Sequence, residues 1–175
     1  MKEWNQLEGK PARLSRTTTT DLVLPPDANH YGTIFGGKVM AYVDKIAAIA
    51  AMRHARHPVV TASSDSLDFL APIKVGEAIH LEAFVTYAHK TSLEVHVKVQ
   101  SEDLMTGELC LTATSFLTFV ALDKDGNKTE VPPVIPETEE ERMLYQTAPE
   151  RMRLRIQRKE QRQQDISSLE NEKAK

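Results

Sequence analysis

Residues 29–37 of this chain read NHYGTIFGG and lead directly into a nearly all-apolar segment whose single carboxylate is Asp44. The paired glycines Gly36 and Gly37 let another molecule approach the backbone closely, because neither residue has a Cβ. Backbone N–H groups at the start of a helix have no partner within that helix, and the helix dipole attracts negative charge to this end. We therefore expect Gly36 and Gly37 to form a site for a developing negative oxygen, as acyl transfer requires.

The apolar segment predicts a long helix over about residues 36–56, with its end marked by Pro58. At 100° per residue, Asp44 lies within about 60° of Gly37 and of several alanines, which predicts small apolar surroundings. An acid in such surroundings is costly unless it has a partner or a use. Asp44 is thus a candidate general base or nucleophile. The alternative is a buried aspartate that ties down a loop or a subunit contact.

Five segments around this helix have the composition or alternation of strands, namely residues 16–24, 59–70, 78–88, 93–100 and 108–122. In the third of them, Tyr87 is expected on the same face as Val85. Short spacers between the last four segments predict antiparallel hairpins in a meander. The fold class is therefore α+β, with a curved antiparallel sheet wrapped around one long central helix. A helix that is apolar almost all round needs further cover, which a second subunit would supply.

The two ends of the chain differ from its centre in composition. Residues 1–15 are predicted to be a polar leader, residues 16–135 the folded domain, and residues 136–175 a charged helical extension. Within the extension, residues 137–146 predict a short helix with acids near its start, and residues 149–164 predict a second, basic helix that opens at Pro149. The polar residues from Asp165 onward are predicted to be disordered.

Composition excludes several classes of protein. Of 175 residues, 41% are hydrophobic and 27% charged, which is typical of one folded domain, and the net charge of −3 argues against general nucleic-acid binding. No apolar run approaches the roughly 20 residues that span a bilayer, and the N-terminus lacks the apolar core of a signal peptide. We therefore expect a cytoplasmic protein with no membrane association.

Metal and cysteine chemistry are not indicated either. The six histidines fall on separate predicted elements without the spacing of metal ligands, so no metal site is expected. The single cysteine, Cys110, cannot form an internal disulfide, which fits a reducing compartment. Its position between Leu109 and Leu111 favours burial in a strand over a role as nucleophile.

Six ordered blocks of this sequence resemble the cytosolic acyl-CoA hydrolases, a family of hotdog-fold thioesterases. They are NHYGTIFGG at 29–37, Val39-Met40 with Asp44, VTAS at 60–63, DFLAPI at 68–73, Gly76, and KTSLEV at 90–95. The resemblance covers about residues 15–135 and, more weakly, the arginine-bearing helix. It implies the hotdog fold and the hydrolysis of acyl-CoA thioesters to a free carboxylic acid and coenzyme A. Coenzyme A is part of the substrate, and no separate cofactor is implied.

The resemblance also implies roles for individual residues. Asp44 would be the base or nucleophile, and Asn29 its partner across a dimer interface. Thr61 would position water or Asp44, and the amide of Gly37, or that of Gly36, would polarise the thioester carbonyl. From the residues alone, Asn29 is equally well explained as a turn-former after Pro-Pro-Asp.

Coenzyme A carries phosphates, so basic residues are expected near its exit from the site. One candidate is Lys90 with Thr91 and Ser92. The other is the group of arginines formed by Arg151, Arg153 and Arg155, although a basic helix is more often a solvated face.

Some members of this family carry two hotdog units in one chain, whereas this chain has one. The resemblance therefore implies a homodimer, and further assembly into a hexamer as a trimer of dimers. Two other functions remain open. One is a non-catalytic hotdog module that binds acyl-CoA as a sensor, and the other is a dehydratase or hydratase, for which His30 is the only histidine near the glycines.

Overall fold

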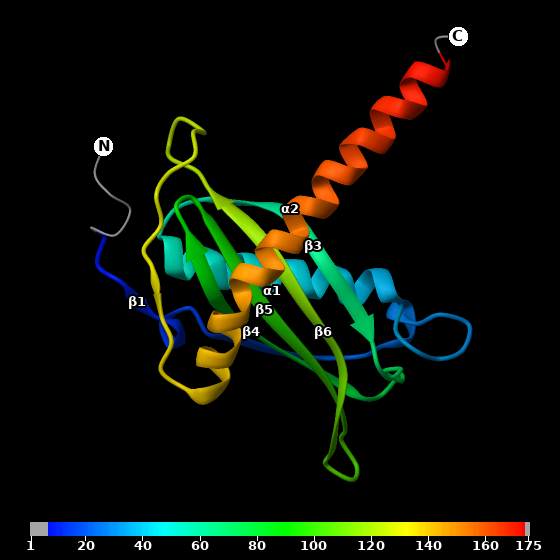
Figure 1. Ribbon diagram of the computed structural model, residues 1–175. Coiled ribbons are helices and arrows are strands. Elements are labelled where there is room, and N and C mark those ends of the chain that lie inside the picture. The colour runs from blue at the N-terminus through cyan, green and yellow to red at the C-terminus, as the bar shows by residue number, and fades with distance from the viewer. Residues whose placement is uncertain (1–6, 174–175) are drawn as a thin grey trace.

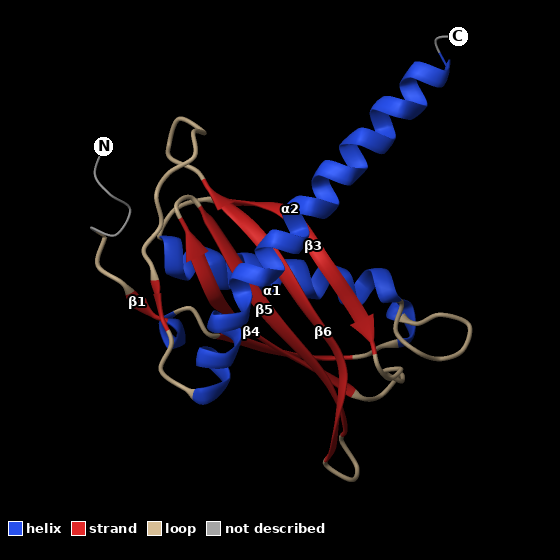
Figure 2. Ribbon diagram, viewed as in Figure 1, coloured by secondary structure: helices blue, strands red, loops and turns tan. Residues whose placement is uncertain are grey.

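The computed structural model describes residues 7–173, so the first six residues of the predicted leader lie outside the described residues. A curved antiparallel sheet wraps around helix α1 (Gly36–Ala55), and a second helix, α2 (Glu139–Lys173), crosses the outer face of the sheet (Figure 1). The C-terminal part of α2 projects beyond the sheet (Figure 2). The predicted α+β architecture is confirmed.

The main sheet has five strands in the order β2-β4-β5-β6-β3. Their bounds are β2 (Thr17–Leu22), β3 (Val59–Phe69), β4 (Ala78–His89), β5 (Ser92–Asp103) and β6 (Glu108–Ala121). A separate parallel pair joins β1 (Lys10–Pro11) to β7 (Val134–Ile135). Two short 3-10 helices, η2 (Ala12–Leu14) and η3 (Pro25–Asp27), complete the described elements.

The predicted meander is wrong at one connection. β3 pairs with β6 at one edge of the sheet, and β4 pairs with β2 near the other. β3 and β4 are therefore three strand spacings apart, or about 14 Å. The intervening residues 70–77 span this gap easily, since an extended chain covers about 3.3 Å per residue. A short spacer therefore does not distinguish a hairpin from a crossing, and the crossing leaves β3 as an edge strand.

The core lies between α1 and the concave face of the sheet. Val43 and Ala47 of α1 are buried against inward residues of the central strands, such as Val97 and Phe119. Tyr87 does not share the face of Val85 as predicted. A register shift between the two residues turns Tyr87 toward α2, where its ring lies 5.3 Å from the ring of Tyr145. Ala88 is buried in its place.

The C-terminal extension is one helix as far as Lys173, so the predicted break at Pro149 is wrong. The last two residues of the segment predicted to be disordered, 174 and 175, lie outside the described residues. Proline normally interrupts a helix because it has no N–H and its ring crowds the preceding turn. Here the guanidinium of Arg151 donates to the carbonyl oxygen of Leu144 and to Thr147 Oγ1, both at 2.6 Å. These bonds tie together the turns on either side of Pro149, which lies inside the helix.

Residues 10–15, the last part of the predicted polar leader, pack against the domain. Ala12 and Ser15 are buried, and the Ser15 hydroxyl accepts a hydrogen bond from the Val85 amide at 2.9 Å. The neighbouring Arg16 forms ion pairs with Glu82 on β4 and with Glu141 on α2. The N-terminal segment therefore links the sheet to the C-terminal helix.

Candidate active site

Asp44 and Thr61 come together at the open side of α1. The helix ends at Ala55, the next residue Arg56 has a left-handed backbone (φ 57°), and Pro58 follows before β3 begins at Val59. This turn returns the chain alongside the helix, where Thr61 Oγ1 donates to Asp44 Oδ1 at 2.8 Å. Two of the predicted site residues thus form a direct pair.

Asp44 is exposed in the single chain. The sheet covers the face of α1 that carries Val43 and Ala47, whereas Met40 and Asp44 remain uncovered. An exposed carboxylate needs no internal partner for stability. Its pairing with Thr61 is therefore better explained by orientation of the carboxylate than by compensation for burial.

Asp44 and Thr61 lie on the wall of a cavity of about 330 Å³ between α1, β3 and β6. The remaining lining residues are apolar or small, namely Met40, Ala41, Val43, Ser64, Leu67, Ser115 and Leu117. Met40 lies in one of the blocks that carry the family resemblance, whereas sequence reasoning missed the strand residues Ser64, Leu67, Ser115 and Leu117 as part of the site. The only signal of these four residues was alternation in β3 and β6, and that signal does not show which strand faces Asp44.

The two glycines occupy the first turn of α1. In the described part of the chain, neither the Gly36 amide nor the Gly37 amide donates to a protein acceptor. A Cβ on Gly37 would meet no described atom within 4 Å, whereas one on Gly36 would lie 3.3 Å from Phe69 Cζ. Gly37 is thus open to an approaching ligand. It precedes Asp44 by two helical turns, about 10 Å along the axis, so a substrate would have to span this distance within one chain.

Asn29 does not contact Asp44 within the chain. Its Oδ1 accepts from the Tyr31 amide at 2.9 Å, and its Nδ2 donates to Thr33 Oγ1 at 3.0 Å. These bonds organise the loop before α1, as the turn-former interpretation predicts. They account for the conformation of the loop, and a contact with Asp44 would have to involve another subunit.

Lys90, Thr91 and Ser92 form the tight hairpin between β4 and β5. Lys90 is exposed with a left-handed backbone (φ 52°), and the Ser92 hydroxyl donates to the His89 carbonyl at 3.1 Å. Ser92 and Val60 both lie opposite Val120 on β6, on the two sides of that strand. The hairpin therefore lies at the same end of the sheet as Thr61, about 10 Å across it.

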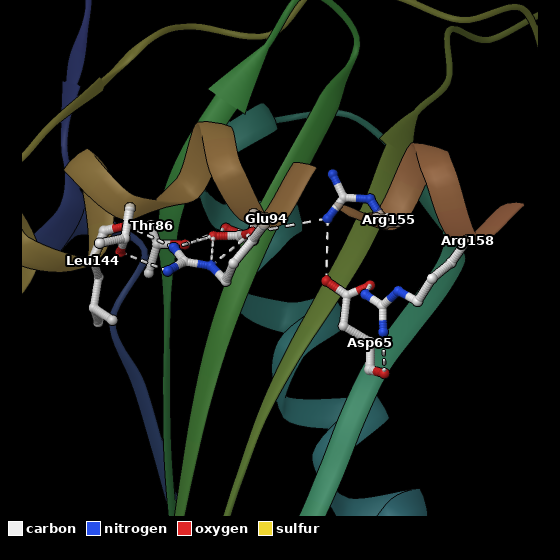
Figure 3. A network of polar contacts seen from close by, with 8 residues as sticks. Asp65, Thr86, Glu94, Leu144, Arg155 and Arg158 are labelled. Carbon is white, nitrogen blue, oxygen red and sulfur yellow. Dashed lines mark hydrogen bonds and ion pairs between the residues drawn. The ribbon is translucent and has the colours of Figure 1, made fainter. Parts of the chain in front are cut away.

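Two of the three candidate arginines are already engaged by carboxylates on the sheet. Arg151 Nη2 lies 2.7 Å from Glu94 Oε1, and Arg155 Nη1 lies 3.3 Å from Asp65 Oδ2 and 3.8 Å from Glu94 Oε2. Figure 3 shows Arg155 and Arg158 directed from α2 toward Asp65 on β3. Arg153 is exposed and pairs with Glu150 on its own helix. A phosphate at Arg151 or Arg155 would have to compete with these carboxylates.

Two other titratable side chains of α1, Tyr42 and His54, contact partners other than Asp44. Burial, together with a hydrogen bond to Asp21, raises the pKa of Tyr42 to about 12. Burial lowers the pKa of His54, whose Nε2 contacts the Pro132 carbonyl at 2.9 Å. Asp44 is the only acidic residue of this helix. It is therefore the natural candidate for proton transfer on α1.

Among residues 7–173, no three His, Cys, Asp or Glu side chains are grouped to hold a metal ion. No helix within the same range has both the length and the hydrophobicity of a membrane span. Cys110 is exposed, so its predicted burial is wrong. It lies near the start of β6, where exposed Leu109 and Leu111 flank it.

Comparison with known proteins settles the family. A model of the thioesterase superfamily matches residues 31–108. Over 159 residues, 91% of this chain and 92% of its relative, the sequence is 51% identical to an uncharacterized acyl-CoA thioester hydrolase, YkhA, of Bacillus subtilis. The chain belongs to the acyl-CoA thioester hydrolases of the thioesterase superfamily. The predicted family and hotdog fold are thus confirmed.

Solved structures agree with this assignment. An apo-hexameric acyl-CoA thioesterase is 56% identical, with a TM-score of 0.85 over 87% of this chain and 97% of the other. A Staphylococcus aureus acyl-CoA hydrolase in complex with butyryl coenzyme A, coenzyme A and coenzyme A disulfide is 45% identical, with a TM-score of 0.87 over 91% of this chain and 98% of the other.

Three further structures of the S. aureus hydrolase carry alanine in place of an aspartate, a threonine or an asparagine. Their TM-scores are 0.88, 0.86 and 0.90, at 44%, 44% and 43% identity, over 91%, 90% and 94% of this chain and 98% of each of those chains. In chain order, these three residues have the same spacing as Asn29, Asp44 and Thr61.

Proposed function

We propose that this protein hydrolyses acyl-CoA thioesters, with the Asp44 carboxylate activating the attacking water. The observation that carries the proposal is the 2.8 Å bond from Thr61 to Asp44 on the wall of an otherwise apolar cavity. The spacing shared with the three substituted residues of the S. aureus hydrolase supports the same choice of residues.

In this proposal, Thr61 holds one carboxylate oxygen of Asp44 and leaves the other free to accept a proton from water. The resulting hydroxide attacks the thioester carbonyl, and the tetrahedral oxyanion accepts a hydrogen bond from the Gly37 amide or from that of Gly36. One such donor is worth about 10²–10³ in rate in other enzymes. Collapse of the intermediate breaks the C–S bond, and the thiolate of coenzyme A takes up the proton. No step of this proposed reaction uses a metal ion or a separate cofactor.

A covalent route through Asp44 would release the same products. The geometry of Thr61 suits it equally, since the free carboxylate oxygen would then attack the carbonyl itself. Single turnover in ¹⁸O-labelled water distinguishes the two routes, because label enters Asp44 only if an acyl-aspartate forms and is hydrolysed at the side-chain carbonyl.

We further propose that Lys90, with Thr91 and Ser92, binds a phosphate group of coenzyme A. Lys90 is exposed, and it lies at the same end of the sheet as Thr61. Both features favour Lys90 as the phosphate-binding residue. The arginines are weaker candidates, since carboxylates already neutralise Arg151 and Arg155 and Arg153 pairs with Glu150.

We propose that the active unit is a homodimer in which Asn29 of one subunit reaches the Asp44 of the other. β3 is an edge strand, and Val60 and Phe69 are exposed along it. An exposed apolar edge favours pairing with another chain. The hexameric thioesterase of similar structure is consistent with a trimer of dimers. A cytoplasmic location is part of the same proposal.

The proposal is tested by incubating the protein with acetyl-, hexanoyl-, decanoyl- and palmitoyl-CoA and following release of free thiol. We expect turnover by the wild type and a loss of at least about 10³-fold in kcat for Asp44→Ala, within the range of general-base catalysis. Lys45→Ala, at the adjacent exposed position, is the matched control. Near-normal turnover by Asp44→Ala would overturn the mechanism, and binding of the thioesters without thiol release by the wild type would make the protein a sensor.

A further inference from the structure

We infer that the cavity beside Asp44 and Thr61 holds the acyl chain and limits it to short and medium lengths, with Ser64 and Leu67 as the residues that set the limit. This inference rests on the proposed hydrolase function and names the substrate class of that site. Its starting point is the position of the candidate catalytic pair on the cavity wall, since a carbonyl within reach of Asp44 would direct its chain into the same space.

The inner part of the cavity is apolar. Val43 and Leu117 are each 3% exposed, and Ser115 is 1% exposed. The Ser115 hydroxyl donates to the Ser66 carbonyl at 2.6 Å, so its polar group is already satisfied. An apolar surface of this kind suits an alkyl chain and disfavours the amide-bearing arm of coenzyme A, whose polar groups would be buried without partners.

Two irregularities in β3 create this space. Register shifts lie between Thr61 and Ser63 and between Ser64 and Ser66, and each adds one residue to the strand. As a result, the residues that line the cavity are Thr61, Ser64 and Leu67, three apart, where a regular strand would present every second residue. The middle position is occupied by the small side chain of Ser64, which leaves room between Thr61 and Leu67.

The volume of the cavity sets the expected chain length. A protein cavity of about 150 Å³ binds benzene, which has six carbons, so a volume of about 330 Å³ holds at most roughly a dozen. Acetyl, hexanoyl and decanoyl groups fit within this limit. A palmitoyl chain exceeds it and would leave several methylenes outside the cavity.

A second cavity provides an internal comparison. It has a volume of about 420 Å³ at the start of α1 and is lined by Gly36, Phe69, Leu70 and neighbouring apolar residues, with no carboxylate among them. A chain placed there would enter beside Gly36, two helical turns from Asp44. Substitutions in this second cavity should therefore leave the chain-length profile unchanged.

The test is the kcat/KM profile over the same four acyl-CoA substrates for Ser64→Leu, Leu67→Ala and the control Leu70→Ala. Leucine at position 64 fills room for about two or three methylenes, each worth about fourfold in binding. We expect Ser64→Leu to lower kcat/KM for decanoyl-CoA by about tenfold or more while acetyl-CoA hydrolysis changes less than threefold. Leu67→Ala should raise relative activity toward palmitoyl-CoA, and Leu70→Ala should keep the wild-type profile.

Retained acetyl-CoA hydrolysis shows that each variant is folded and that the hydrolase function stands. With that activity present, a profile that neither Ser64→Leu nor Leu67→Ala shifts would overturn the inference, as would a shift caused by Leu70→Ala. If Ser64→Leu does not fold, Leu67→Ala decides the question alone, since removing atoms from a partly buried position does not block folding by overlap. Absence of all thiol release by the wild type would instead refute the proposed function.

Discussion

The hydroxyl of Thr61 orients the Asp44 carboxylate through a hydrogen bond of 2.8 Å between two exposed side chains. Because neither residue is needed to fill the core, the pair can be changed with little effect on the fold. Elsewhere, single residues bear on stability more than on activity. His96, for example, is buried on the outer face of the sheet between the rings of Phe84 and Phe116.

Thr61→Val is expected to lower kcat by about 10- to 100-fold, since a hydrogen bond to a charged group is worth about 1.5–3 kcal/mol. Thr61→Ser keeps the hydroxyl and should retain most activity. Thiol release at saturating substrate measures both variants, and thermal melting checks that they are folded. Equal kcat for Thr61→Val and the wild type would remove Thr61 from the proposed mechanism.

The stability of the protein should fall between pH 6.5 and pH 4 because of His96. Burial, and then the nearby charges of Arg151, Lys98 and Arg16, lower its pKa to about 4. The unfolded chain binds a proton at about pH 6.5, so the unfolded state gains protons first as the pH falls, and stability is lost across this window. The expected loss is about 3 kcal/mol.

His96→Phe should remove most of this pH dependence. Phenylalanine keeps a ring between Phe84 and Phe116 but has no titratable group. Urea unfolding at pH 7 and pH 4.5 measures the free energy of unfolding for both proteins. If the difference between the two pH values is the same for His96→Phe and the wild type, His96 is not the group responsible.

At the scale of elements, α2 is held to the sheet by charged contacts on its sheet-facing side. Arg151 contacts Glu94 through two nitrogens, and its guanidinium lies 4.1 Å from the centre of the Phe116 ring. Arg155 and Arg158 both contact Asp65, which lies at the irregular part of β3. The helix thus binds the outer face of the strand whose inner face carries Thr61 and Ser64.

Arg151→Met should destabilise the protein by about 3 kcal/mol, because Glu94 is 4% exposed and would lose its main charged partner. The matched control is Arg153→Met on the same helix, which removes an exposed pair with Glu150 and should cost less than about 1 kcal/mol. Denaturant midpoints at pH 7 measure both. Similar costs for the two variants would show that the Glu94 pair does not hold α2 in place.

At the scale of the whole molecule, one chain leaves its candidate site incomplete. Asn29 is engaged within its own loop, Asp44 is exposed, and β3 is an unpaired edge. A second copy placed along β3 would cover this side of α1. In a two-fold dimer, each subunit would then supply different residues to two identical sites.

Mixing two inactive variants tests this arrangement. Asn29→Ala and Asp44→Ala should each be nearly inactive alone, whereas random exchange of their subunits should restore about a quarter of wild-type activity, since half the dimers are mixed and each has one intact site. Activity after co-refolding or co-expression measures the exchange. A mixture as inactive as its components, with mixed dimers shown by mass spectrometry, would place Asn29 and Asp44 in separate sites.

The sequence by itself determined the parts of this protein that depend on local periodicity and on motifs. Apolar spacing and Pro58 predicted α1 to within a residue, alternation predicted β5, and the ordered blocks around Asp44 predicted the family. Local patterns suffice there because a helix or strand buries the face that its own sequence makes apolar.

Only the tertiary structure decided which distant segments meet. The place of β3 at the sheet edge, its two irregularities and the cavity that they open depend on strand pairing, which spacer lengths do not specify. The continuity of α2 could not be predicted from the sequence either. Pro149 favours a break in the helix, and the contacts of Arg151 offset that tendency. Strand pairing depends on the free energy of packing of the whole chain. The sequence of a single segment does not specify that free energy.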